Sequence, residues 1–404
     1  MFLKLAWRNI WRNKRRTAIT LGSIFFAVIL STLMSSIKEG VYVNMIKNSA
    51  GDFYGYAQIQ LKGYNEEKTL DYSFEFTDEV KNAVGSESAI EESLPRLESF
   101  ALASHKTVSK GALVVGVNPE KEKLGTQLHN RVVEGEYLTQ NDNEVLIGDG
   151  LAEYMNVTVG DTIVLLGQGY HGVSAAGKYR IKGIVKFGSP EISKQVVFLP
   201  LKTAQTLYGA ENLITNLVLQ VNSANAGIKV AKKLKTQLPE NLVAYDWQEL
   251  NPGLVKMIET DRTEGYVFMF ILYLVISFGI FGTILMMLAE RKHEFGVLVA
   301  IGMKRFQLAV LVWLEVISIS VLGAIVGVIG ALPVCFYLYF SPIKLGDELK
   351  QMTEEYGLEA VLQPSVAPEI FINQGIIVFC LAATIAIYPL IKLLSIDAIK
   401  QMRS

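Results

Sequence analysis

Four long apolar segments dominate the pattern of hydrophobic and polar positions along the chain. They run from Thr17 to Ile37, from Tyr266 to Leu288, from Leu308 to Phe340 and from Gly375 to Leu394. Because a helix needs about 20 apolar residues to cross a bilayer core about 30 Å thick, each segment predicts a membrane-spanning helix. The third is longer than one span requires, which indicates a tilt, a protrusion beyond the bilayer or a bend at Pro333.

The segment before the first span has the pattern of an amphipathic helix. Lys4, Arg8, Arg12 and Arg15 recur at helical spacing, while apolar residues and two tryptophans fall on the other side. Residues 1–16 therefore predict a helix at the membrane surface, with its arginines facing anionic lipid. Two alternatives are charges that only set the topology and a cleaved secretory signal. The long apolar run and the absence of a small-x-small cleavage site disfavour the signal.

Residues 38–265, between the first two spans, alternate between strand-like and helix-like patterns. β-rich runs bounded by Gly, Asn or Asp lie at residues 56–61, 112–117, 144–148, 161–166, 179–187, 195–200 and 215–221. Helical windows lie at residues 78–84, 149–155, 201–208 and 224–238. Strands and helices do not alternate regularly, so the stretch predicts an α+β domain rather than a parallel α/β sheet.

The distribution of charge orients these elements. The segment before the first span carries six basic residues and no acid, whereas the loop 341–374 carries six acids and two lysines. By the positive-inside rule the N-terminus is cytoplasmic, and four spans then place 289–307 and the tail 395–404 in the cytoplasm. The sequence predicts an α-helical membrane domain with four transmembrane helices and a large α+β extracytoplasmic domain inserted between helices 1 and 2.

Composition agrees with a protein of mixed character. Half of the 404 residues are hydrophobic and 19% are charged, with a net charge of −1, so nucleic acid is not an expected partner. The only cysteines, Cys335 and Cys380, fall in predicted spans. The extracytoplasmic stretch therefore has no disulfide and no cysteine-ligated metal.

Residues that could carry catalysis are scattered. The four histidines, His105, His129, His171 and His293, lack the short spacing of a zinc site, and no serine lies in a Gly-x-Ser-x-Gly elbow. We expect no catalytic residue, metal site or bound cofactor in this chain.

One glycine-rich stretch, "GVSAAGKY" from Gly172 to Tyr179, has the glycine spacing and lysine of a phosphate-binding loop. Its last residue is Tyr179, where such a loop needs Ser or Thr, and a strand follows where a helix is required. The better interpretation is a hairpin tip within "GQGYHGVSAAG" that could touch an external partner. Its candidate contact residues are Gly167, Tyr170, His171, Gly172 and Gly177.

The stretch "ERKHEFGVLVAIGMKR", from Glu290 to Arg305, is more organised than a simple connection between two spans. Phe295, Leu298, Val299 and Gly302 fall on a single helical face, and a charged cluster precedes them. Glycines at positions 296 and 302 are typical of close backbone approach. We interpret the face as one that meets a partner or the membrane; the alternative is a plain connecting loop.

At this stretch the sequence resembles the FtsX/MacB/Lol family of ABC-transporter permeases. "ERKHEFGVLVAIGMKRFQL", followed by "VLVWLEVISISVLGAIVGVIGAL", is similar to the family's Arg/Glu-rich turn, glycine-containing run and Glu-containing helix. "LAWRNIWRNKRRTAITLGSIFFAV" resembles its N-terminal helix and first span. "NEVLIGDGLAEYMNVTVGDTIVLL" with "YRIKGIVKF" resembles its MacB-like periplasmic core domain, and "IKLLSIDAIKQM" fits its tail.

The resemblance implies that residues 289–307 form a coupling helix docked on a separate ATPase subunit, which binds the ATP and Mg²⁺. The coupling residues it implies are Glu290, Arg291, Glu294, Phe295, Gly296, Leu298, Ala300 and Gly302. Expected partners are an ATPase dimer, a second permease copy or sister permease, and a periplasmic lipoprotein carrier. The build resembles the lipoprotein-releasing LolC/LolE branch; an FtsX-like regulator of a cell-wall hydrolase and a MacB-like efflux permease are the alternatives.

The sequence departs from the family pattern at two places, and three residues within the predicted spans are notable. Val299 stands where many members have a basic residue, and the loop 341–374 is longer than the resemblance implies. Glu315 lies inside the third span and is tolerable if it pairs with the basic turn or water, in a structural or a functional role. Gly323 and Gly327 form a small-xxx-small face, which favours tight helix packing over a hinge.

Overall fold

The computed structural model describes residues 2–12, 14–344, 346 and 361–394, and these form two compact units. The first unit is helical and contains the described residues of 2–42, 258–344 and 361–394. The second contains residues 43–257. The predicted tail 395–404 and most of the acidic part of loop 341–374 lie outside the described residues.

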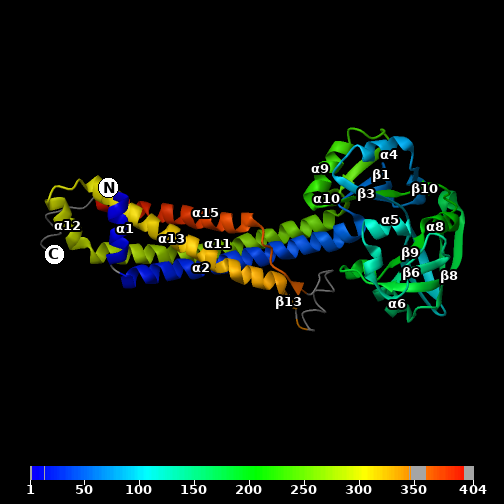
Figure 1. Ribbon diagram of the computed structural model, residues 1–404, viewed down its shortest axis with the longest axis horizontal. Coiled ribbons are helices and arrows are strands. Elements are labelled where there is room, and N and C mark those ends of the chain that lie inside the picture. The colour runs from blue at the N-terminus through cyan, green and yellow to red at the C-terminus, as the bar shows by residue number, and fades with distance from the viewer. Residues whose placement is uncertain (1, 13, 345, 347–360, 395–404) are drawn as a thin grey trace. The chain divides into compact units, whose positions relative to one another are not determined.

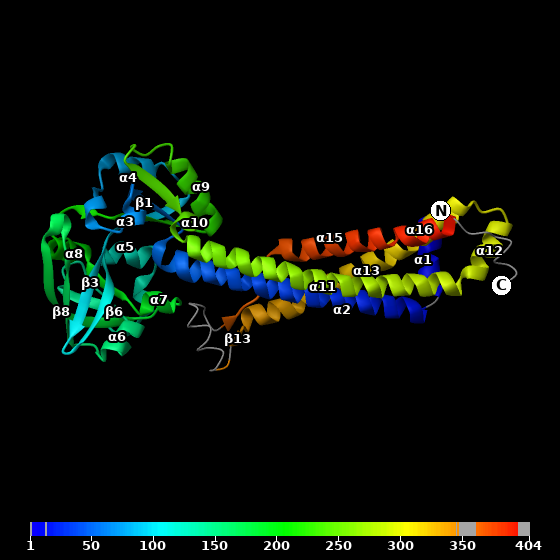
Figure 2. The same cartoon turned by 180° about the vertical axis from the view of Figure 1, so that it is seen from behind.

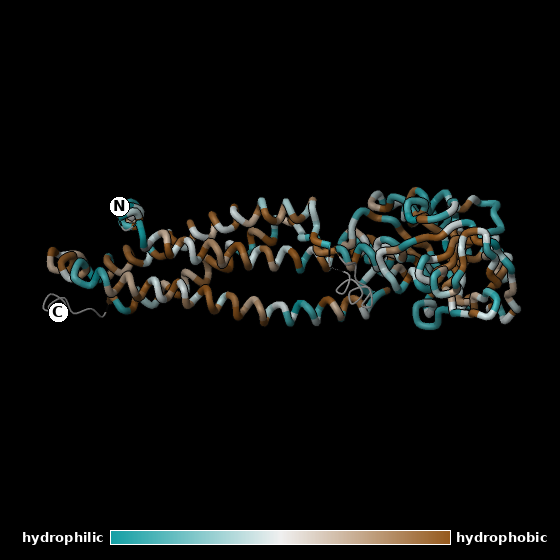
Figure 3. The backbone as a smooth tube through the Cα atoms, turned by 90° about the horizontal axis from the view of Figure 1, so that it is seen from below, coloured by the Kyte–Doolittle hydropathy of each residue, from teal (hydrophilic) through white to brown (hydrophobic). Residues whose placement is uncertain are grey.

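The helical unit is built on four long apolar segments, as the hydropathy pattern predicted. Among the described residues, Thr17–Tyr54, Pro252–Glu290, Arg305–Phe340 and Pro368–Leu394 are long and apolar enough to cross a membrane. They run side by side in Figure 1, and Figure 3 shows hydrophobic residues recurring along the long helices. The helices are α1 (Phe2–Arg12), α2 (Lys14–Ile46), α11 (Pro252–Glu290), α12 (Lys292–Ala300), α13 (Arg305–Phe340), α15 (Pro368–Ile385) and α16 (Ile387–Leu394).

The first two long helices extend beyond the predicted spans. α2 continues past Ile37 to Ile46 and passes into a π-helical segment, Lys47–Tyr54, and α11 begins at Pro252 rather than near Tyr266. Charged side chains hold this extension together, because Lys38 pairs with Asp261 at 3.2 Å and Glu39 with Arg262 at 3.2 Å. The compact units divide after residue 42 and after residue 257, whereas the sequence analysis placed the ends of the domain at 38 and 265.

The third and the last span each contain a proline away from their ends, Pro333 and Pro389, and the two spans respond differently. α13 is continuous from Arg305 through Pro333 to Phe340. The last span is instead two helices that meet at Ala386. Pro389 explains the break, because it has no N–H to donate to the carbonyl of Ile385 four residues earlier and its ring clashes with that carbonyl.

The second unit is the predicted α+β domain, built on one mixed sheet (Figure 2). Its strand order is β12-β1-β11-β3-β4-β9-β6-β8-β5, with β7 pairing to β3 and β8. The strands are β1 (Ala57–Leu61), β3 (Ile90–His105), β4 (Val108–Val117), β5 (Val132–Gly135), β6 (Glu144–Gly148), β7 (Thr162–Gln168), β8 (Ser174–Val185), β9 (Val196–Pro200), β11 (Asn216–Val221) and β12 (Leu242–Asp246). Two short strands, β2 (Phe74–Glu75) and β10 (Leu213–Ile214), pair separately, as do β13 (Ile343–Lys344) and β14 (Val361–Leu362) in the helical unit.

Short helices of this domain cover the sheet. They are α3 (Tyr64–Glu67), α4 (Asp78–Gly85), α5 (Pro119–Leu124), α6 (Asp149–Met155), α7 (Pro190–Ser193), α8 (Leu201–Tyr208), α9 (Ala224–Leu234) and α10 (Trp247–Leu250). Every predicted β-rich run falls on a strand, and every predicted helical window falls on a helix. The α+β prediction is confirmed, since only β4–β9 and β6–β8 pair in parallel.

β3, the longest strand, is absent from the predicted runs. It joins the two halves of the sheet, because it pairs with β11 up to Arg96 and with β4 from Arg96 onward. Arg96 is only 1% exposed. Its Nε and Nη2 donate to the two carboxylate oxygens of Glu122 at 2.7 and 3.0 Å, and its Nη1 donates to the carbonyl of Phe53 at 2.5 Å.

Candidate functional site

The turn between α11 and α13 is folded into a short helix with a defined end. α12 runs from Lys292 to Ala300. The N–H of Met303 donates to the carbonyl of Leu298 and that of Gly302 to the carbonyl of Val299, both at 3.1 Å, which is a Schellman motif. Gly302 has φ +106° and open space around its Cα. Glycine is needed here for its left-handed backbone, and not for the close approach that the sequence suggested.

Arg291 anchors this helix to the third span. Its side chain is 8% exposed, and its Nη1 donates to Oε2 of Glu315 at 2.7 Å. Glu315 is fully buried. The guanidinium also lies 5.2 Å from the centre of the Phe295 ring. The basic turn is therefore the partner that a carboxylate inside the third span requires.

The same guanidinium continues into a network at the surface. Nε of Arg291 donates to Oε2 of Glu294 at 3.0 Å, and Nη2 of Arg12, at the end of α1, binds both oxygens of Glu294 at 2.5 and 2.6 Å. The hydrogen bond from Arg12 is the main reason that the pKa of Glu294 lies below its ordinary value, and Arg291 adds to the effect. Arg12, Glu294, Arg291 and Glu315, here called the arginine–glutamate network, thus link α1, α12 and α13.

The apolar face that the sequence assigned to a partner or the membrane is covered in large part by this chain itself. Phe295 is 1% exposed and belongs to the core of the helical unit, and Leu298 and Val299 are half-buried against that core. Arg291 and Gly296 are also buried. Arg291, Phe295 and Gly296 are therefore not at the surface, which contradicts their predicted contact with an ATPase, whereas the contact of half-buried Leu298 stays a prediction. Periodicity identifies the apolar face of a helix but does not reveal which neighbour covers it.

A different stripe of α12 faces outward. His293, Val297, Ala300 and Ile301 lie at i, i+4, i+7 and i+8, which is one helical face, and all four are exposed. Val297 is 39% exposed and Ile301 is 79% exposed. Glu290, at the end of α11, is exposed as well. Of the predicted coupling residues, the structure therefore leaves Glu290, Glu294, Ala300 and Gly302 at the surface.

The glycines of the third span lie where α13 meets α2. A Cβ added at Gly323 would come within 2.7 Å of Ile24, and one at Gly327 within 2.7 Å of Val28. Distances this short mean that only glycine allows the two backbones to approach so closely. α13 is helical without interruption across both positions, so the geometry is that of packing and not of a hinge.

The glycine-rich hairpin is tighter than the sequence indicated. β7 and β8 remain paired as far as Gln168 and Ser174, so Gly167 and Gly177 lie in strands, and only residues 169–173 form the tip. His171 and Gly172 adopt positive φ there, and the His171 N–H donates to Asp71 at 3.3 Å. The small residues of "SAAG", Ser174 to Gly177, belong to β8 and continue its pairing with β7, although the sequence analysis placed them in the hairpin loop. Lys178 lies within β8 opposite Val164, so no helix N-terminus follows the glycines.

Sequence reasoning missed the pairing of Arg12 with Glu294. The two residues are 282 positions apart, and both lie in charged clusters that looked solvated. The only local signal in the sequence is that Arg12 ends an amphipathic helix. In the structure, Ala6 and Ile10 on the apolar side of that helix are fully buried. A helix that buries its apolar face against the protein brings its terminal charge near other polar groups.

Two family models match this chain. Residues 17–237 match the MacB-like periplasmic core domain, and residues 266–398 match the FtsX-like permease C-terminal domain. The first match covers the first span and β1 to β11, and the second covers the other three spans and α12 with Arg291, Glu294 and Glu315.

Individual relatives agree with these matches. The lipoprotein-releasing system transmembrane protein LolC of Neisseria meningitidis is 20% identical over 324 residues, which cover 75% of each chain. LolC of Xylella fastidiosa is 23% identical over 248 residues, 58% of each chain. The macrolide export ATP-binding/permease protein MacB of Nitrosomonas europaea is 22% identical over 84% of this chain and 52% of its own.

Among solved structures, the periplasmic region of MacB from Actinobacillus actinomycetemcomitans is similar over 53% of this chain and 97% of its own, with 14% identity and a TM-score of 0.36. The family matches span the core domain and the helical unit in the order that the fold requires. The chain is thus a multi-pass membrane protein of the FtsX/MacB/Lol family of ABC-transporter permeases, in which a MacB-like periplasmic core domain is inserted after the first span.

Proposed function

We propose that this chain is the membrane subunit of a lipoprotein-releasing ABC transporter, and that α12 receives the movement of a separate ATPase. The observation that carries the proposal is the outward stripe of α12, His293, Val297, Ala300 and Ile301, on a helix fixed from behind by Arg291 and Glu315. An exposed isoleucine and valine on a rigid support have the character of a docking site. LolC relatives support lipoprotein release as the task.

The proposed orientation places α1, α12 and the C-terminus in the cytoplasm and the core domain in the periplasm. It rests on the basic N-terminal segment and the acidic loop 341–374. The chain would itself be non-catalytic, with ATP and Mg²⁺ held by the partner ATPase dimer. A second copy or a sister permease, a periplasmic lipoprotein carrier and surrounding lipid are the other partners we propose.

In this proposal the movement passes from α12 to the core domain through a buried ion pair and close helix contacts, both of which resist separation. A push on α12 reaches α13 through the buried Arg291–Glu315 pair, since separating two buried charges is costly. α13 passes it to α2 through the glycine contacts at Gly323 and Gly327. α2 continues without a loop into the first residues of the core domain. This path needs no channel for a polar solute.

Co-purification with the partner ATPase tests the docking role. Ile301→Glu would bury an unpaired carboxylate at the contact, which costs about 2–4 kcal/mol and weakens assembly from about 30-fold to several hundred-fold. The matched control is Leu124→Glu, the same kind of change at a residue that is 73% exposed in the core domain. Equal retention of the ATPase by both variants, at equal membrane levels, would rule out the docking stripe.

One relative favours a second function. The MacB protein of Nitrosomonas europaea, whose printed name is macrolide export, aligns with 84% of this chain. Efflux of a small molecule is therefore the alternative transport task, and regulation of a cell-wall hydrolase is the FtsX-like one. Depletion of the chain separates lipoprotein release from the other two, because lipoproteins accumulate in the inner membrane only if release is its task.

A further inference from the structure

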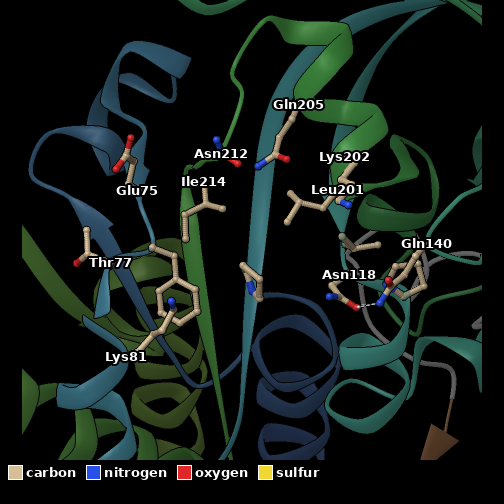
Figure 4. Close-up of a pocket in the computed structure, with 14 residues that line it drawn as sticks. Glu75, Thr77, Lys81, Asn118, Gln140, Leu201, Lys202, Gln205, Asn212 and Ile214 are labelled. Carbon is tan, nitrogen blue, oxygen red and sulfur yellow. Dashed lines mark hydrogen bonds between the residues drawn. The ribbon is translucent and has the colours of Figure 1, made fainter. Parts of the chain in front are cut away.

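A pocket of about 520 Å³ lies in the core domain where β3 leaves β11 and joins β4. Its lining comes from both halves of the sheet (Figure 4). Glu75, Thr77 and Lys81 form one wall, and Leu201, Lys202 and Gln205 of α8 form the other. Pockets of about 300–1,000 Å³ at the junction of two substructures are typical ligand sites. No role assigned so far uses this one.

The floor of the pocket is apolar and fixed. Pro95 of β3, Val117 of β4 and Ile214 of β10 line it, and all three residues are buried. The aromatic ring of Phe76 adds to the lining. A surface of this kind accepts an aliphatic or aromatic side chain, because burying it removes apolar area from water.

Carboxamide side chains surround this floor. Asn118, Gln140, Gln205 and Asn212 all line the pocket. Gln205 is only 8% exposed; its Nε2 donates to the carbonyl of Leu213 at 2.9 Å, and its Oε1 accepts no hydrogen bond from the residues that the structure describes. The amide points from α8 into the pocket in Figure 4. This oxygen is open to the pocket, so it can accept a hydrogen bond from an N–H or O–H group of a ligand or water.

The charge of the pocket is uneven. Lys81 is occupied, because it pairs with Asp78 at 2.8 Å and lies over the ring of Phe76. Lys202 has no ion pair with any residue in the described ranges. It stands in the first turn of α8, which has neither an acidic residue nor a side-chain cap. The partial positive charge of that helix end adds to the charge of Lys202 and favours an anion beside it.

Together these groups specify one ligand chemistry. An extended peptide offers N–H groups to Gln205 Oε1, both donors and acceptors to the other carboxamides, and a side chain to the apolar floor. An acidic residue would complete the fit beside Lys202. Glu75, on the opposite wall, disfavours a second negative charge at that end. We propose that this pocket binds an extended peptide segment with an acidic residue, from a protein partner of the core domain.

The test uses the full chain in nanodiscs of zwitterionic phosphatidylcholine. The probes are the blocked pentapeptide acetyl-Ala-Ile-Ala-Glu-Ala-amide and its counterpart with Lys in place of Glu, titrated by calorimetry. We expect saturable binding of the acidic peptide and at least about tenfold weaker binding of the basic one. No saturable binding of the acidic peptide at millimolar concentration, or equal binding of both, overturns the proposal.

Three variants locate the binding. Lys202→Glu should weaken the acidic peptide at least about tenfold and improve the basic one. Glu75→Gln should leave the acidic peptide as tight or tighter. The matched control is Lys232→Glu, a solvent-exposed lysine of α9 outside the pocket, which should change nothing. If Lys202→Glu binds the acidic peptide like the parent, the pocket is not its site and the proposal falls.

Two further probes separate other anions from a peptide. Free glutarate carries the carboxylate without the backbone, so we expect it to bind at least about tenfold more weakly. Equal affinity for glutarate would replace the peptide with a small carboxylate. Nanodiscs with added phosphatidylglycerol should not compete; competition that Lys202→Glu abolishes would identify a lipid headgroup instead.

Discussion

Each unit of this protein contains a buried arginine–glutamate pair, and the two pairs are built differently. Arg96 in the core domain directs its hydrogen bonds into the interior: both oxygens of Glu122 and the carbonyl of Phe53 accept from it, and Thr126 donates to Glu122 as well. Arg291 in the helical unit divides its donors between fully buried Glu315 and half-exposed Glu294. One pair is closed, while the other leads to the surface.

The difference teaches what each pair is suited to do. The closed pair has a second carboxylate nearby, Glu98 at 4.0 Å from Arg96, but that group is buried as well, so the pair holds β3, α5 and the segment after α2 in place without reaching the surface. An open pair ends in Glu294, which water, Arg12 and Arg291 can all reach. Its outer end can exchange partners while its inner end stays fixed. The first arrangement supports a rigid domain, and the second suits a helix that receives a push.

The largest expected effect comes from breaking the closed pair. Arg96→Met leaves Glu122 buried without its countercharge, which should lower the free energy of unfolding of the core domain by about 3–5 kcal/mol. Protease resistance of the full chain across a urea series measures it. Lys121→Met, which breaks the half-exposed pair with Glu92, is the control and should cost about 1 kcal/mol or less. Similar losses in both variants would contradict the closed character of the Arg96 pair.

A smaller effect is expected at the inner end of the open pair. Glu315→Gln keeps the shape but removes the charge that faces Arg291, and we expect α12 to open more easily by about 1.5–3 kcal/mol. Hydrogen exchange of residues 292–300 measures this opening. Replacing both residues, Arg291→Met with Glu315→Met, should recover most of the protection because no unpaired charge remains. If the double variant opens as easily as Glu315→Gln, the anchor is not this ion pair.

The smallest effect belongs to the outer end. The pKa of Glu294 is lowered in the folded protein, so its pairing stabilises the fold at neutral pH and is lost as pH falls through that lowered value. Glu294→Gln should cost less than about 1 kcal/mol, since the group is half-exposed. Spin labels at positions 8 and 293 should move apart in the parent as the pH falls through the lowered pKa of Glu294. The variant should show that wider distance at every pH; a pH-dependent change that persists in it would exclude Glu294 as the titrating group.

The sequence alone was sufficient for elements that follow one simple rule. Apolar length located the four long helices, and β-rich runs bounded by Gly, Asn or Asp located strands such as Glu144–Gly148, whose last four residues are all buried. β3 was missed because Pro95, Arg96 and Glu98 interrupt its apolar pattern. Those side chains are buried all the same, since Glu122 and the carbonyl of Phe53 satisfy Arg96. In a sequence, the members of a buried ion pair cannot be distinguished from polar surface residues until their partners are known.

The site around α12 was predicted in part. Local spacing identified the helix, its glycine end and an apolar face, and the basic turn was foreseen as a partner for Glu315. Which face points outward depends on α1 and α13, whose positions no local pattern encodes. Ile301, the most exposed apolar residue of this segment, follows the last residue of the helix and was not among the predicted contacts.

The position of β1 in the sheet has a consequence for how the chain matures. β1 is made soon after α2, yet both of its partners, β11 and β12, come near the end of the domain. During synthesis its two edges stay unpaired until almost the whole domain has emerged. Unpaired strand edges favour aggregation, and contacts between distant segments form slowly. Assembly of this domain therefore depends on protection of one early strand, which makes the interval before β11 emerges the vulnerable period of its biogenesis.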